Sequence, residues 1–198
     1  YAPAFKKAYD FLVENNKAEP KNWKDEEIKK WLGYSEKEMW ETFMSDLEEP
    51  YKTEAGSIIG KEMINQILSG KAELYDNALD VLKELRRRGY DIVFLSNCSI
   101  NYMKTSDKMF NLNYYFNDMI CTEMFDYIPK YEVLNKIKYN YKMNQVIVGD
   151  RFHDIESAIK NNIYSIFCEY GYGDISEANK ANVNIKDIKE ILRYFEET

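Results

Sequence analysis

Two carboxylates stand close together in the sequence where an apolar run ends. Asp150 follows the apolar run 146–148 and Gly149, and Asp154 comes four residues later. Hard carboxylate oxygens suit Mg²⁺, which takes one or two carboxylates together with water and phosphate oxygens. We therefore predict a magnesium site at Asp150 and Asp154. The simpler alternative is that both aspartates cap the helix that follows and complement its dipole.

Three further residues, at two places in the chain, have side chains that could bind an anion. Ser96 and Asn97 follow the apolar run 92–95, and their hydroxyl, amide and backbone N–H groups could bind an anionic oxygen at a helix N-terminus. Lys130 stands directly before a helical pattern, where its ammonium could neutralise a phosphate or keep a carboxylate ionised. The simpler alternatives are a helix cap for Ser96 or Asn97 and a solvated surface lysine for Lys130. For His153 we expect exposure or a packing role rather than catalysis.

A sheet is needed to bring these residues together, and the apolar pattern after residue 73 predicts one. Short apolar runs alternate with helical patterns, at 92–95, 119–121, 145–148 and 164–168. Continuous apolar runs between helices indicate parallel strands covered on both faces, and ligands bind at the carboxyl ends of such strands. We predict an α/β fold whose doubly wound, Rossmann-like parallel sheet, in residues 73–198, carries the site.

Residues 1–72 show helical patterns only. Apolar and aromatic side chains recur on one stripe over 5–13 and again over 40–47, after a capping box of Ser35 and Glu38. We therefore predict a small helical accessory domain over 1–72, joined to the sheet near residues 70–75.

Composition excludes several classes of function. The chain has 198 residues, 45% of them hydrophobic, and a net charge of −7, so disorder and general attraction to nucleic acid or anionic membranes are not expected. Three cysteines and a single histidine are too few for a disulfide scaffold or a zinc site. Without a bilayer-length apolar run or a signal peptide, we expect a cytoplasmic protein with no membrane or nucleic-acid partner.

The order of these motifs resembles that of the haloacid dehalogenase superfamily, in its subclass I and its phosphoglycolate-phosphatase-like branch. Ser96 matches the second motif of the family, Lys130 the third, and the pair Asp150 and Asp154 the fourth. The resemblance covers nearly the whole chain, because the family inserts a helical cap after its first strand, where residues 1–72 fall.

The first motif of that family is absent from the 198 residues: no Asp-x-Asp occurs in them. In the family, the first of those aspartates attacks phosphorus and the second is the general acid and base. Their strand lies at the centre of the family sheet, between the strands that end at Ser96 and Asp150, and its removal leaves backbone groups unpaired. We expect residues 73–198 to be a core lacking its first strand, with the nucleophile on an N-terminal segment outside this chain. The chain alone is then expected to be inactive.

The resemblance implies a mechanism and a role for each matched residue. Ser96, Asn97 and Lys130 would bind the phosphoryl oxygens, and Asp150 with Asp154 would hold Mg²⁺ while a small phosphorylated metabolite is hydrolysed through an aspartyl-phosphate. Ser96, Lys130 and Asp150 are the predicted catalytic residues in this chain.

Two alternatives remain. A non-catalytic binding or regulatory module on the same fold would account for the absent nucleophile. A haloacid dehalogenase needs no metal, but the dehalogenases of the family carry Ser and Asn where this chain has Gly149 and Asp150. We favour the phosphatase, because a protein that had abandoned phosphate chemistry would have little reason to keep a lysine and two carboxylates at one strand edge.

Overall fold

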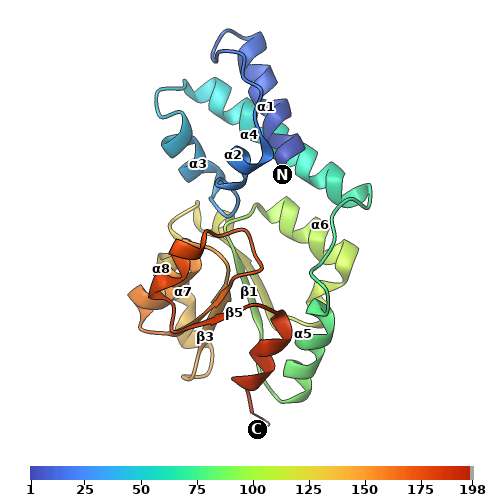
Figure 1. The fold of residues 1–198 in the computed structure, drawn as a ribbon, viewed down its shortest axis with the longest axis vertical. Helices are drawn as coiled ribbons and strands as arrows, with labels where there is room; N and C mark the ends of the chain where they lie inside the picture. The colour runs from blue at the N-terminus through green and yellow to red at the C-terminus, as the bar shows by residue number, and fades with distance from the viewer. Residues whose placement is uncertain (197–198) are drawn as a thin grey trace.

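The computed structural model describes residues 1–196, with a helical unit at one end and strands and helices at the other (Figure 1). The α-helices are α1 (Ala2–Glu14), α2 (Asp25–Lys29), α3 (Glu36–Phe43), α4 (Glu49–Leu68), α5 (Ala78–Arg87), α6 (Ile100–Phe110), α7 (Lys130–Ile137) and α8 (Phe152–Asn161). The strands are β1 (Val93–Ser96), β2 (Asp118–Cys121), β3 (Val146–Gly149), β4 (Tyr164–Cys168) and β5 (Val183–Ile185). Short 3-10 helices are η1 (Leu112–Tyr114), η2 (Thr122–Phe125), η3 (Lys138–Asn140), η4 (Ile175–Lys180) and η5 (Ile188–Arg193).

The helical unit, α1 to α4, has a core of its own that is rich in aromatic side chains. Phe43 packs at ring-centroid distances of 5.4 Å from Phe5 and 5.2 Å from Trp31. The predicted first helix is confirmed as α1. The second stripe is shorter than predicted, because α3 ends at Phe43 and the chain then turns toward α4.

All strand pairs are parallel, as predicted for an α/β fold, but they form two hydrogen-bonded sheets rather than one. β1 pairs with β2, with Ser96 opposite Cys121. β3 pairs with β4 and β4 with β5, with Gly149 opposite Phe167. The carboxyl ends of β1 and β3 both point toward the helical unit (Figure 1). Our sequence analysis did not predict β5, because it is only three residues long and has a polar Asn184 at its centre.

Among the described residues, β1 and β3 each have a hydrogen-bonded strand on one side only, and they share no ladder hydrogen bond. One helix nevertheless contacts both strands, since Leu95 of β1 and Ile147 of β3 pack against one cluster of buried side chains on α7. On the described chain the edge of β3 is not fully covered, and Val148 is 40% exposed. The strand before Asp150 was expected to be buried in a sheet covered on both faces, but β3 is only partly buried and has a hydrogen-bonded neighbour on one side only.

The helices of the sheet region begin at polar residues. α6 starts at Ile100, after its N-cap Ser99. α5 follows its N-cap Asn77, which is in the left-handed conformation (φ 63°). No helix within residues 1–196 combines the length and apolar character that crossing a bilayer requires.

Candidate active site

Ser96 and Asn97 lie where β1 ends, but neither caps α6. The N-cap is Ser99, whose Oγ accepts a hydrogen bond from Tyr102 N–H at 3.2 Å. Ser96 Oγ accepts from Cys98 N–H at 3.3 Å, within the turn. The buried Asn97 donates from Nδ2 to the carbonyl oxygen of Gly33 at 2.7 Å, so its amide contacts the helical unit. The capping alternative is therefore wrong for both residues.

Lys130 and Asp154 form a largely buried ion pair between α7 and α8. Lys130 Nζ lies 2.8 Å from Asp154 Oδ1, and the two side chains are 11% and 12% exposed. The other oxygen, Oδ2, accepts from the backbone N–H of Arg151 at 3.0 Å. Lys130 is thus not a solvated surface residue, whereas Asp154 both satisfies the start of α8 and orients the ammonium.

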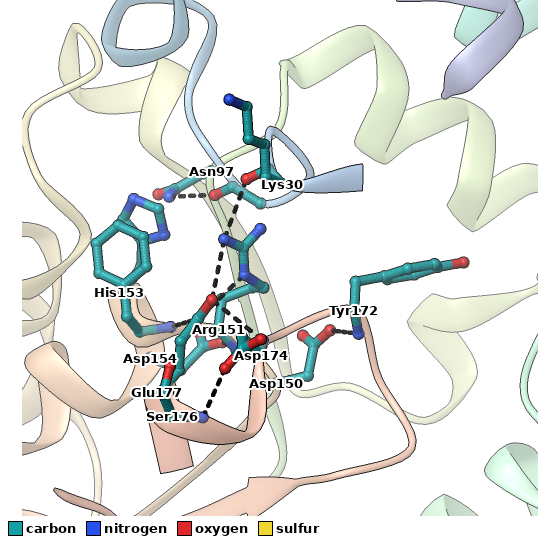
Figure 2. Close-up of polar contacts among 12 residues, drawn as sticks. Lys30, Asn97, Asp150, Arg151, His153, Asp154, Tyr172, Asp174, Ser176 and Glu177 are labelled. Carbon is teal, nitrogen blue, oxygen red and sulfur yellow. Dashed lines mark hydrogen bonds and ion pairs between the residues drawn. The ribbon is translucent and has the colours of Figure 1, made fainter. Parts of the chain in front are cut away.

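Asp150 is held by a loop that our sequence analysis did not identify. Its Oδ2 accepts a hydrogen bond from Tyr172 N–H at 2.6 Å (Figure 2). A Cβ at Gly171 would overlap the Asp150 side chain, and one at Gly173 would overlap its carbonyl oxygen. The glycines on either side of Tyr172 are the feature of the sequence that could have indicated this loop, since glycine allows a backbone to approach this closely.

Burial is the main electrostatic effect on Asp150. It raises the pKa of this carboxyl above the usual aspartate range, Tyr172 N–H lowers the pKa, and the nearby charge of Asp154 raises it again. No three His, Cys, Asp or Glu side chains within residues 1–196 converge as a metal cage. A donor set of one or two carboxylates completed by water fits Mg²⁺ rather than zinc. Asp150 is suited to contact the metal directly. Both oxygens of Asp154 already accept hydrogen bonds, so Asp154 is suited to act through water or by orienting Lys130.

His153 has a packing role, one of the two alternatives expected in place of catalysis, and it is buried rather than exposed. Its ring stacks on that of Phe152 at a centroid distance of 3.8 Å and makes a T-shaped contact with the ring of Tyr34 at 4.9 Å. Nε2 lies 2.9 Å from Oε2 of Glu38. Ser35 Oγ accepts from Glu38 N–H as the capping box predicted, but the Glu38 carboxylate contacts His153.

Arg151, to which our sequence analysis gave no role, also links the sheet region to the helical unit. Its Nη2 donates to the carbonyl oxygen of Lys30 at 3.2 Å, and its Nε contacts Glu177 at 3.2 Å (Figure 2). The helical unit therefore sits over the carboxyl ends of β1 and β3, held by polar contacts next to the candidate site.

Comparison with known protein families identifies the family to which the chain belongs. The family model of haloacid dehalogenase-like hydrolases matches residues 5–168. The chain belongs to this family. No protein with a curated description matches it in sequence.

Solved structures of haloacid dehalogenase-like proteins share the fold. A predicted phosphatase from Clostridium acetobutylicum superposes with a TM-score of 0.80 at 21% identity, over 98% of this chain and 90% of that one. A predicted phosphoglycolate phosphatase from Haemophilus somnus gives 0.78 at 17%, over 98% and 90%. CbbY from Rhodobacter sphaeroides, solved with phosphate, gives 0.75 at 14%, over 96% and 87%.

A cavity of about 560 Å³ lies between the helical unit and the sheet region of this haloacid dehalogenase-like chain. Lys29 of α2, Tyr102 of α6 and Tyr172 line it. Its volume is within the range of small-molecule pockets. Tyr172 links the cavity to the candidate site, because its backbone N–H donates to Asp150 while its ring points away from that carboxylate (Figure 2).

Gly33 is expected to be essential for docking the helical unit. Its φ is +87°, and a Cβ there would lie 2.8 Å from Cγ of Arg151. We expect Gly33→Ala to lower the free energy of unfolding by at least about 2 kcal/mol, because the left-handed backbone and the contact are both disfavoured. Urea denaturation measures this.

Gly70→Ala is the matched control for that experiment. Gly70 has a φ of +70° with no atom within 4 Å of its would-be Cβ, so it isolates the backbone effect, about 1 kcal/mol. An equal decrease in the free energy of unfolding in the two variants would show that the close contact between residue 33 and Arg151 does not affect stability.

Proposed function

We propose that this chain forms the cap and most of the core of a magnesium-dependent phosphatase that acts on a small phosphorylated metabolite. The observation that carries the proposal is the largely buried Lys130–Asp154 pair next to Asp150, at the carboxyl ends of parallel strands in a haloacid dehalogenase-like hydrolase. An ammonium that a carboxylate holds where most water is excluded binds a phosphoryl group more strongly than one in bulk water. The three free cysteines suit a reducing cytoplasm, where we place the protein.

In this proposal the described residues bind and orient the phosphoryl group. The Ser96 hydroxyl and the Lys130 ammonium bind its oxygens, and Asp154 holds Lys130 in position. Asp150 holds Mg²⁺, which when bound offsets the charge of the phosphate. Tyr172 N–H fixes the direction of the Asp150 carboxylate before any ligand arrives.

We place the nucleophile on a strand outside these 198 residues, which would form the aspartyl-phosphate. The unshared edges of β1 and β3 support this, since both strands lie on α7 and run in the same direction. A parallel strand between them would bond to both edges and would end beside Ser96 and Asp150, the residues at and just after the ends of those strands.

The helical unit would then act as the cap and its cavity would hold the leaving group. Tyr172 joins the cavity to the loop that holds Asp150, and the lining also includes Lys29 and Tyr102. A small phosphorylated substrate also agrees with the related CbbY structures, one with phosphate and one with xylulose-(1,5)bisphosphate.

Hydrolysis of p-nitrophenyl phosphate tests the proposal. We expect turnover from the chain extended by its N-terminal segment in millimolar Mg²⁺, a fall to background with EDTA and recovery when Mg²⁺ is restored. The 198-residue chain alone is expected to show none, because it holds no Asp-x-Asp.

Two outcomes would contradict the proposal. No turnover by the extended chain with several phosphate esters would favour a non-catalytic binding module. Chloride release from a short haloacid without metal would favour a dehalogenase.

A further inference from the structure

Glu177, in η4, joins two segments that flank Asp150. Its Oε2 accepts from Phe152 N–H at 2.6 Å and lies 3.2 Å from Nε of Arg151. Its Oε1 accepts from Asp174 N–H at 3.2 Å. One carboxylate thus ties the start of α8 to the segment that follows Tyr172 (Figure 2).

Asp150 depends on both of these segments. It directly precedes Arg151 in the chain, and its Oδ2 accepts the N–H of Tyr172. The backbone at Gly173 lies so close to the Asp150 carbonyl that it leaves no room for a side chain. The direction of the Asp150 carboxylate therefore depends on how residues 171–174 are held against residues 150–152.

Capping of η4 alone does not account for these contacts. Glu190 occupies the same place in η5: its Oε1 accepts from Asp187 N–H at 3.0 Å and from Lys186 N–H at 2.9 Å, and its Oε2 lies 3.3 Å from Arg193. All those partners belong to its own turn. Glu177 differs because two of its partners come from a segment 25 and 26 residues away.

We propose that Glu177 is a positioning residue for the Asp150 carboxylate. It acts through the 171–174 loop, whose Tyr172 N–H sets the direction of that carboxylate. The importance of Asp150 rests on the proposed phosphatase function, whereas the positioning itself is a property of the folded chain. A charge-assisted bond from Arg151 and a short bond from Phe152 N–H make this one contact hard to replace.

Amide hydrogen exchange of the 198-residue protein, measured by NMR, tests the positioning without any turnover. We expect Glu177→Ala to speed exchange of the Tyr172 N–H by about tenfold or more, because the loop opens locally. The Ile166 N–H in β4 is expected to change by less than about twofold. Glu177→Gln keeps an acceptor for Phe152 N–H but loses the charge, so its effect should be smaller, and it serves if the alanine variant does not fold.

Glu190→Ala is the matched control, since it removes an equivalent cap whose partners all lie in its own turn. We expect it to leave Tyr172 exchange unchanged. The proposal is overturned if Glu177→Ala and Glu177→Gln affect Tyr172 no more than Glu190→Ala does. In the extended chain, Glu177→Gln should lower kcat with little change in KM. If that chain shows no turnover while Tyr172 exchange responds as expected, the phosphatase proposal fails and the positioning stands.

Discussion

Asp150→Asn is expected to lower the kcat of the extended chain at least about a hundredfold and to raise the Mg²⁺ concentration needed for half-maximal rate. The carboxamide oxygen can still accept Tyr172 N–H, so the loop that holds residue 150 should keep its conformation. What disappears is the negative charge that would hold the metal. Initial rates across a Mg²⁺ titration measure both effects, and near-normal activity would remove Asp150 from the metal site.

Stability should respond to this substitution in the opposite sense from activity. Burial raises the pKa of Asp150, so its ionised form is less favourable in the folded chain than in the unfolded chain. Asn lacks that penalty. The variant should therefore be at least as stable as the natural protein above the folded pKa of Asp150, and the difference should vanish at lower pH, where the aspartate is neutral in both states. Urea denaturation at several pH values, without metal, checks the sign.

Lys130→Met is expected to lower both activity and stability. Loss of the ammonium should reduce kcat by about two orders of magnitude, as for other groups that stabilise transition-state charge. It also leaves the Asp154 carboxylate buried without its cation, which should lower the free energy of unfolding by about 3 kcal/mol. Steady-state kinetics and urea denaturation measure the two effects separately.

Two controls separate the chemistry of Lys130 from its structural effect. Lys160→Met removes a surface lysine that pairs with Glu156 on α8, and it should change stability by less than about 1 kcal/mol. The double variant Lys130→Met with Asp154→Asn should recover much of the lost stability, because no charge is left unpaired, but none of the activity. Recovery of activity in the double variant would contradict the role of Lys130 in binding phosphate.

Local patterns predicted most of the strands and helices and the strand ends at which the candidate site residues lie. The alternation of apolar runs with helical stripes located β1 to β4, and the parallel arrangement placed Ser96 and Asp150 at the ends of strands. The pairing of Lys130 with Asp154 agrees with one of the two roles expected for that lysine. These predictions succeeded because periodicity and strand direction are properties of short segments.

The contacts between distant segments could not be predicted from such patterns. Glu38 and His153 are 115 residues apart, and the Arg151 contact with Lys30 spans 121 residues. A helical stripe shows which face of a segment is buried but not against what. Glu177 looked like an ordinary surface acid, because nothing local shows that its partners include the start of α8. The division into two sheets likewise depends on which strand edges meet.

Three of the polar contacts that hold the helical unit in place leave from chain neighbours of candidate site residues. Asn97 follows Ser96, Arg151 follows Asp150, and His153 precedes Asp154. Lifting the helical unit would break these contacts and free the adjacent peptide units, so opening and loss of order in the site are thermodynamically coupled. By reciprocity, a molecule whose binding orders the site must also favour the closed arrangement. The closed arrangement would then both retain the bound molecule and order the residues that act on it.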